Sequence, residues 1–160
     1  MTAPAANAAG SFVLLQVGNR RFALSAEHVA ELAPPVRLHT FPHESPLVIG
    51  VIVRRGRIVP VYDVAPILIG RASGTHRFYL IAGRMFGRVA EPSAIPLHGE
   101  CELATGETGP PEAGSPAYIS GSLSVGEARV PVLDLEALVT FRAASASPNG
   151  SPSAAPGRPR

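Results

Sequence analysis

The side chains most able to do chemistry in this sequence are a pair of aspartates and a pair of nearby histidines. Asp63 and Asp134 could serve as two carboxylates in acid–base catalysis. Each of them stands directly before a short apolar segment, however, where an aspartate caps a helix by accepting backbone N–H groups. His39 and His43 have a spacing that would suit a metal ion on a helix, but Pro42 between them indicates a loop. The bland interpretations, helix caps and solvated loop histidines, are preferred.

The single cysteine, Cys101, offers no better catalytic group. It lies in an acidic loop with no basic neighbour to lower the pKa of its thiol. One cysteine allows no internal disulfide, and a structural zinc site would need several of the five scattered histidines. No Ser–His or Cys–His arrangement stands out. The sequence therefore predicts no catalytic residue, no metal and no cofactor, and a hydrolase or metal enzyme is a remote third interpretation.

Arginines form the more distinctive pattern, because all fourteen basic residues are arginine. Arg20 and Arg21 lie at one expected turn, and Arg54, Arg55 and Arg57 cluster at another. These turns could serve a nucleic-acid-binding small β-barrel, but such modules stack bases on aromatic side chains. Aromatic residues make up only 6% of the chain, with no tryptophan. Protein docking is preferred, since the arginine fork matches carboxylates, and nucleic-acid binding remains the alternative.

Composition bounds the kind of protein. With 160 residues and 46% hydrophobic residues, the chain can build one domain with a real core. Residues 1–88 carry ten arginines and four acids, whereas residues 89–128 carry six glutamates and no arginine. Two patches of opposite sign would suit docking on more than one partner, although chance segregation explains them equally well. No apolar run spans a membrane and no signal peptide is evident, so a reduced, cytoplasmic location is the default.

Three segments are too polar or have side chains too small to enter the core. Residues 1–10 are predicted to be a flexible N-terminal arm, and the Pro/Ser/Ala-rich residues 143–160 a disordered tail. Residues 99–116 are acidic and rich in glycine and proline, which predicts a loop. The ordered chain is expected to consist of two blocks, about 11–98 and 117–142.

The ordered blocks are rich in strand signals. Residues 12–17 and 20–24 are apolar runs joined by Gly18 and Asn19, a pair typical of a tight hairpin turn. Ser25 is expected to cap a short helix over residues 26–32, with Val29 and Leu32 on its buried face.

A second strand pair follows at residues 48–53 and 57–62, joined by Arg54-Arg55-Gly56. The first of these strands is apolar on both faces, which predicts a central or barrel-enclosed position. Pro60 has no N–H for a strand ladder, so its N–H side should face an edge or a bulge. Asp63 should then cap a short helix over residues 64–69.

This strand–turn–strand–aspartate–helix unit occurs twice. Residues 50–68 align without a gap on residues 121–139, 71 positions later, with five identities. The identical pairs are Gly50/Gly121, Val59/Val130, Pro60/Pro131, Val61/Val132 and Asp63/Asp134. Weaker echoes link Phe22 with Phe86, and Ala26-Glu27 with Ala90-Glu91. Neither unit alone has enough strand to bury its faces, so we expect an all-β fold of two small barrels packed together, with short helices.

The segment Gly50 to Val64, which reads G-V-I-x-x-R-G-x-I-V-P-V-x-D-V with Arg55 before the glycine, resembles the signature of CheW-like domains. Residues 12–32 and 118–135 also resemble this family, so the domain should cover residues 11–142. The family implies two intertwined, pseudo-repeated five-stranded β-barrels without catalytic activity. It also implies an adaptor that couples a CheA-type histidine kinase, through its regulatory domain, to the cytoplasmic tip of chemoreceptors. The chain length favours a free adaptor.

The resemblance assigns partner-binding positions residue by residue. Arg55 matches the turn arginine implicated in coupling, with Arg54 beside it. Val29 and Glu31 match the region after the first hairpin that contacts partners, and Gly50 matches the glycine that enters the strand near the receptor-facing groove. The chain departs from the family at Val53-Arg54, where Asn-Leu is usual. It also departs at residues 90–93, where Pro92 should disrupt a short helix.

Overall fold

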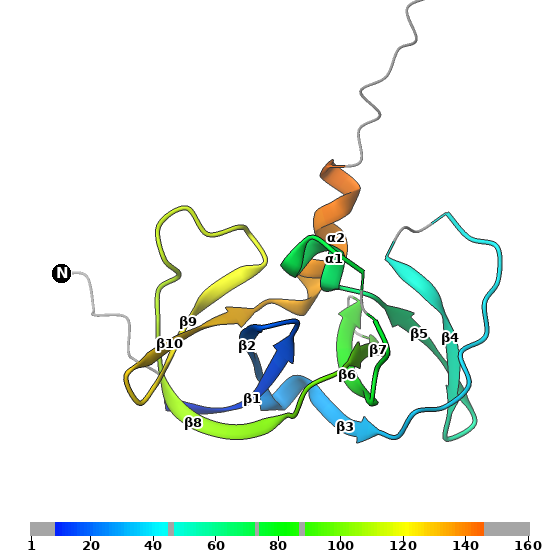
Figure 1. Ribbon diagram of the computed structural model, residues 1–160, viewed down its shortest axis with the longest axis horizontal. Helices are drawn as coiled ribbons and strands as arrows, with labels where there is room; N and C mark the ends of the chain where they lie inside the picture. The colour runs from blue at the N-terminus through cyan, green and yellow to red at the C-terminus, as the bar shows by residue number, and fades with distance from the viewer. Residues whose placement is uncertain (1–8, 45–46, 73, 87–88, 146–160) are drawn as a thin grey trace, which may run out of the picture.

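The computed structural model describes residues 9–44, 47–72, 74–86 and 89–145 of the chain. Within these residues, ten strands form two five-stranded sheets, and two short α-helices lie over the junction between the sheets (Figure 1). The predicted all-β fold of two five-stranded barrel units with short helices is confirmed.

The first unit is a closed barrel with strands in the order β1-β2-β10-β9-β8. Its strands are β1 (Ala9–Val17), β2 (Arg20–Ser25), β8 (Glu102–Gly109), β9 (Ile119–Val125) and β10 (Ala128–Leu133). The interior is filled by Phe12, Leu14, Ala23, Leu123, Val130 and Val132. This barrel therefore combines strands from the beginning and the end of the described chain. It is called the first barrel below.

The second unit is a curved sheet with strands in the order β3-β6-β7-β5-β4. Its strands are β3 (Val29–Ala33), β4 (Val48–Arg54), β5 (Arg57–Tyr62), β6 (Phe78–Phe86) and β7 (Val89–Leu97). Its inner face buries Ala33, Ile52, Val59, Val61, Tyr79, Ile81 and Ala94. A backbone bridge between His39 and Val51 ties the segment after β3 to β4, which brings the two sheet edges toward each other. This unit is called the second barrel below.

A third apolar cluster holds the two barrels together. Along β1, Phe12 and Leu14 face the barrel interior, whereas Val13, Leu15 and Val17 face the second unit. That alternation is the two-residue period of a strand, and it explains why this strand is apolar on both faces. Helices α1 (Ala65–Ile69) and α2 (Leu135–Ser145) cover the same cluster with residues that include Leu68 and Leu138.

The internal repeat extends further than the sequence alignment alone indicated. Val61 of β5 bridges Ala94 of β7 in parallel, and Val132 of β10 bridges Ala23 of β2 in the same way. Both members of one bridge lie 71 positions from their counterparts in the other. The weaker echoes, Phe22 with Phe86 and residues 26–27 with 90–91, have a different spacing and do not match this register, so they were wrong.

β3 of the second barrel and β8 of the first barrel also carry the repeat. Residues 31–33 in β3 and residues 102–104 in β8 both read Glu-Leu-Ala. Ala33 pairs with Tyr79 of β6, and Ala104 pairs with Phe12 of β1. All five strands of one barrel thus have a counterpart in the other, and the repeat is interlaced along the chain.

The repeat begins with a glycine in both copies, Gly50 and Gly121, and the close approach of a neighbouring backbone explains this identity. A Cβ on Gly50 would lie 2.6 Å from the carbonyl oxygen of His39, and a Cβ on Gly121 would lie 2.8 Å from that of Gly109. Neither distance is possible for a real side chain, so both positions need glycine for close approach of the backbone.

The repeated prolines lie on β5 and β10, next to the strand pairs that are joined by a single bridge. Pro60 and Pro131 each come directly before the residue that forms the single parallel bridge of its barrel. Because proline has no N–H to donate, the ladder between these strands cannot extend through it. Pro60 was expected to face an edge or a bulge, but β5 lies between β7 and β4, and its pairing with β7 is a single bridge at Val61.

Three sequence predictions of local structure were wrong. Residues 26–32 form only a 3-10 turn, η1 (Ala26–His28), followed by β3, and Ser25 makes no side-chain cap. Pairing of β3 with β6 outweighs the weak helix preference of this short segment. Residues 90–93 lie in β7, where no short helix exists for Pro92 to disrupt.

The third wrong prediction is the loop over residues 99–116. Most of its first half is β8, which pairs with β1 and β9. Its polar residues Glu102, Thr105 and Glu107 are exposed to solvent, which a strand with one solvent-facing side allows. Gly106 is required there, since a Cβ would lie 2.6 Å from the carbonyl oxygen of Ser124.

β4 also differs from its predicted central or enclosed position. It is the last strand in the order of the second sheet, and Val53 on it is 54% exposed. The predicted arm and tail fall mostly on residues 1–8 and 146–160, outside the described residues. β1 begins at Ala9 and α2 ends at Ser145.

Candidate functional site

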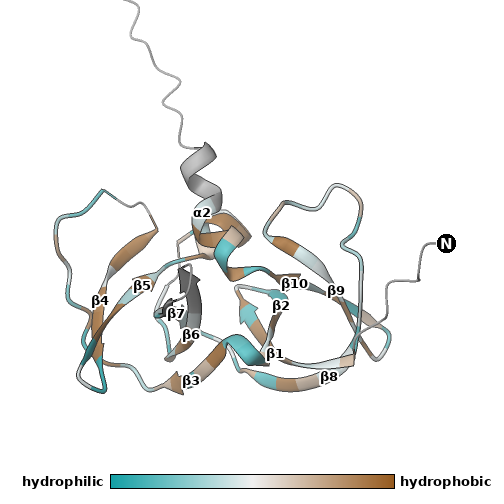
Figure 2. Ribbon diagram, turned by 180° about the vertical axis from the view of Figure 1, so that it is seen from behind, coloured by the Kyte–Doolittle hydropathy of each residue, from teal (hydrophilic) through white to brown (hydrophobic). Residues whose placement is uncertain are grey.

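The turn between β4 and β5 presents Arg54 and Arg55, of which Arg55 has a constrained backbone conformation. Arg54 and Arg57 are paired, so Arg55 and Gly56 form a two-residue turn. Both residues have positive φ angles, 52° and 73°, as this hairpin turn requires. Glycine adopts this conformation without strain, whereas Arg55 does so at a cost of roughly 1–2 kcal/mol. Figure 2 shows the turn as a hydrophilic tip beyond the apolar strands β4 and β5.

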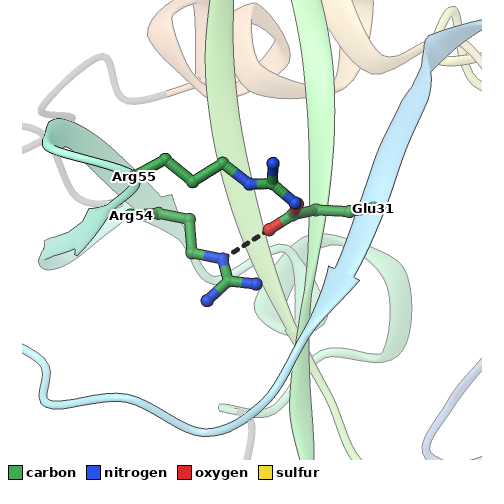
Figure 3. A network of polar contacts seen from close by, with 3 residues as sticks. All are labelled: Glu31, Arg54 and Arg55. Atoms are coloured by element: carbon green, nitrogen blue, oxygen red, sulfur yellow. Dashed lines mark hydrogen bonds and ion pairs between the residues drawn. The ribbon is translucent and has the colours of Figure 1, made fainter.

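Glu31 on β3 forms ion pairs with both arginines (Figure 3). The Nε atom of Arg54 donates to Oε1 of Glu31 at 2.5 Å, and Nη2 of Arg55 lies 2.8 Å from Oε2. The Glu31 side chain is 19% exposed and that of Arg54 is 29% exposed, whereas that of Arg55 is 77% exposed. Glu31, Arg54 and Arg55 are called the arginine clamp below.

The arginine clamp connects opposite ends of the second sheet. β3 is its first strand in spatial order and β4 its last, and no strand ladder joins them. The clamp therefore bridges the gap between β3 and β4, together with the backbone bridge of His39 and Val51. Its inner pair is partly shielded from water, and its outer arginine is available to another molecule.

The electrostatics of the clamp favour an ionised glutamate. The hydrogen bond from Arg54 lowers the pKa of Glu31 below its usual 4.5. Partial burial opposes this shift, while the charges of Arg54 and Arg55 reinforce it. The clamp thus stays charged at neutral pH, with two guanidinium groups shared by one carboxylate and a net positive outer surface.

The five residues assigned from the family resemblance fall into two groups. Glu31, Arg54 and Arg55 come together in the clamp. Val29 lies on β3, opposite Ala82 of β6, and packs half-buried against the cluster between the barrels. Gly50 is buried on β4, where its contact with the backbone of His39 gives it a packing role.

Arginines of the other turn already have internal partners. Arg20 donates to the carbonyl oxygen of Leu68 at 3.0 Å, and its guanidinium lies 5.0 Å from the centre of the Phe22 ring. Arg21 forms an exposed ion pair with Glu102 at 2.9 Å. Four of the five arginines considered for nucleic-acid binding are thus engaged within the protein, three of them with carboxylates. These contacts weigh against the nucleic-acid alternative.

The predicted cap at Asp134 is confirmed, whereas at α1 the N-cap residue is Val64 and Asp63 bonds the first turn from one residue further out. Asp63 accepts the N–H of Ala65 at 3.1 Å, and Asp134 accepts the N–H of Ala137 at 3.1 Å. Among the described residues, no group of three or more histidine, cysteine or acidic side chains could hold a metal ion. Cys101 is half-buried, and burial raises the pKa of its thiol, which opposes formation of a reactive thiolate.

Sequence reasoning missed an apolar pair beside the clamp. Val53 and Ile58 are paired across β4 and β5, and they are 54% and 71% exposed. The signal was present in the sequence, because both residues flank the arginine turn and alternate with the buried Ile52 and Val59. The outer face of this hairpin therefore combines an apolar pair with the arginine tip, a composition typical of protein interfaces.

A groove runs along the junction of the two barrels. A cavity of about 280 Å³ is bordered by Ser25 and His28 from the connection between them, Gly83 of the second barrel and Ser120 of the first. Asp134 and Glu136 at the start of α2 make its rim acidic. Both barrels line this groove, whereas the arginine clamp belongs to the second barrel alone.

No helix within the described parts of the chain is long and apolar enough to cross a membrane.

Comparison with known proteins agrees with this architecture. Residues 11–143 match the family model of the CheW-like domain. The fold is similar to the crystal structure of the scaffolding protein TtCheW from Thermoanaerobacter tengcongensis, with a TM-score of 0.65 and 17% sequence identity. That match covers 82% of this chain and 92% of TtCheW. No curated protein matches the sequence. Because the family model spans most of the chain, and the doubled barrel it implies is present, the chain belongs to the family of CheW-like domains.

Proposed function

We propose that this protein is a non-enzymatic adaptor that couples a CheA-type histidine kinase to chemoreceptors in chemotaxis-type signalling. The CheW-like domain over residues 11–143 is the observation that carries the proposal. The partners are the regulatory domain of the kinase and the cytoplasmic tip of the receptor, which implies a cytoplasmic location. Such a protein acts by fixing the spacing of its partners, so it biases kinase activity through assembly and needs no chemistry of its own.

The arginine clamp and the hairpin beside it support a docking role. Arg55 is exposed and held in position by Glu31, so less side-chain freedom is lost when a partner carboxylate binds it. Val53 and Ile58 supply apolar area next to that charge. Arginine is enriched among interface hot spots, and the apolar pair beside it adds contact area that a partner can bury.

Binding of the two partners to the full chain tests the proposal. The kinase regulatory domain and a receptor-tip fragment from the same genome are titrated separately into the chain by isothermal calorimetry. Saturable binding of both is expected. Arg55→Ala should weaken at least one of them about tenfold, as loss of a charged hydrogen-bonding contact does. Arg37→Ala, which changes an exposed arginine away from the clamp, is the matched control. Binding of neither partner would refute the proposal.

The nucleic-acid alternative predicts a different result. Phosphate contacts make affinity fall steeply with salt, so a gel shift at low and moderate salt separates the two functions. We expect no salt-dependent shift of DNA or RNA at concentrations where the kinase domain is bound.

A further inference from the structure

A cavity at the end of α1 has a chemistry that the adaptor proposal does not use. Its volume is about 340 Å³, within the range of small-molecule sites. It lies between the turn that joins β1 to β2, helix α1, the segment after α1 and the residue that follows β7. The described lining residues are Val17, Gly18, Ala65, Ile69, Arg71, Ala72, Gly74 and His98.

The wall formed by β1 and α1 is apolar. Val17 and Ala65 are buried, at 4% and 1% exposure, and Ile69 packs partly buried beside them. A Cβ on Gly18 would lie 3.0 Å from Cδ1 of Ile69, so the turn passes tightly against this wall. An apolar group of a ligand in the cavity would therefore be shielded from water by this wall.

The opposite wall is cationic or polar. Arg71 is exposed and makes no ion pair with any described residue, and its Nη2 atom lies near the turn at Gly18. The Nε2 atom of His98 is buried and has no hydrogen-bond partner in the described structure. A buried polar atom without a partner costs about 1–3 kcal/mol. No aspartate or glutamate is among the described residues of the lining.

An anion with a short apolar tail satisfies both walls at once. Its tail would lie against Val17, Ala65 and Ile69, and its carboxylate would pair with Arg71. His98, in the tautomer that carries a proton on Nε2, would donate to the same carboxylate. Gly74 lies against that nitrogen, since a Cβ there would stand 3.7 Å from it, so the His98 ring must turn toward the cavity to donate.

We propose that this cavity binds a short-chain aliphatic carboxylate, with Arg71 and His98 as its polar partners. The inference is independent of the adaptor function, because none of the lining residues belongs to the arginine clamp or to the groove between the barrels. A ligand held between α1 and the first barrel would give the domain a small-molecule site besides its docking surfaces.

The test titrates sodium hexanoate into the full chain labelled with nitrogen-15, at pH 7 and constant ionic strength. Saturable shifts are expected in the backbone signals of Gly18, Ala65, Ile69 and Gly74. Hexanol and inorganic phosphate should each bind at least about tenfold more weakly, because each satisfies only one wall. Shifts that do not saturate, or that lie elsewhere, overturn the proposal.

Variants assign the polar partners. Arg71→Gln should weaken hexanoate about tenfold, and Arg37→Gln should leave its affinity unchanged. His98→Leu removes the unpartnered nitrogen and should also weaken binding. Arg71 is exposed, so its variant remains informative if His98→Leu fails to fold. Equal affinity of hexanol and hexanoate, equal affinity of phosphate, or insensitivity to Arg71→Gln would each contradict the proposed site.

Discussion

At the scale of single residues, the arginine clamp joins a strained turn to a charged pair. Arg55 holds a left-handed backbone conformation that glycine would adopt without strain. A functional reason for keeping arginine there is its exposed guanidinium, positioned by Glu31. Strain of this kind persists where the surrounding structure and the function both require the side chain.

The first prediction separates the backbone and side-chain roles of Arg55. Arg55→Gly should be more stable than Arg55→Ala by about 1 kcal/mol, because alanine keeps the left-handed strain and glycine does not. Both variants should lose partner binding equally. Urea unfolding and calorimetric titration measure the two effects. If Arg55→Ala unfolds the protein, the residue is structural and its docking role is wrong.

The second prediction concerns pH. Folding lowers the pKa of Glu31, so the ionised side chain stabilises the fold. This stabilisation is fully present at pH values above the usual glutamate pKa of 4.5. It is lost as the pH falls through the lower value of the folded protein. The difference in unfolding free energy between the natural chain and Glu31→Gln should therefore be constant from pH 7 to about 5, and it should shrink at lower pH. A difference that grows on acidification would contradict the assigned ion pair.

At the scale of elements, the repeated unit shows which features sequence reasoning could find. The aspartate caps, the hairpin turns and the glycine-led strand pair depend on local chemistry, so they were predicted. That β3 and β8 are strands was not predicted, because both are formed by pairing with a hairpin distant in the sequence. Both strands contain the sequence Glu-Leu-Ala, but a match of three residues indicates a repeat only once the pairing register of the strands is known.

The third prediction compares the two caps. Asp134 is exposed, and Asp134→Ala should cost about 1 kcal/mol, as loss of a helix N-cap usually does. Asp63 is 6% exposed, so Asp63→Ala also leaves buried N–H groups without a partner and should cost about 1–3 kcal/mol. Thermal and urea unfolding of both variants measure which substitution costs more stability. Equal costs would show that burial of Asp63 adds nothing.

The fourth prediction concerns the repeated glycines. Gly50→Ala and Gly121→Ala should each destabilise the fold by about 1–3 kcal/mol, because their methyl groups would collide with a backbone carbonyl. Gly114→Ala is the control for left-handed strain alone, since its φ is 81° and a Cβ there would meet nothing within 4 Å. It should cost less. A neutral Gly50→Ala would show that the strands can separate without loss.

At the scale of the whole molecule, the fold is two like-built barrels whose strands are interlaced. The all-β class and the doubled unit followed from the 71-residue spacing, because identical caps and prolines imply identical local structure. That the barrels are intertwined was implied by the family resemblance, but the distribution of strands between them required the structure, since hydrophobic period alone does not specify long-range pairing. Of the candidate site, Glu31, Arg54 and Arg55 were named from the sequence, whereas the pairing of Glu31 with both arginines and the exposed pair of Val53 and Ile58 required the structure.

Duplication also gives the two barrels different outer faces. The positions of Val53 and Ile58 in the second barrel correspond to Ser124 and Arg129 in the first, 71 residues later. One hairpin face is therefore apolar and the other polar, which suits an adaptor that must distinguish two partners.

The most direct test of the adaptor account is a bridging measurement. Receptor-tip fragments are immobilised, and retention of the kinase regulatory domain is measured with and without the full chain. The account predicts that the kinase domain is retained only when the chain is present, and that Arg55→Ala reduces this retention while Arg37→Ala does not. Retention that is independent of the chain, or no retention in its presence, would contradict it.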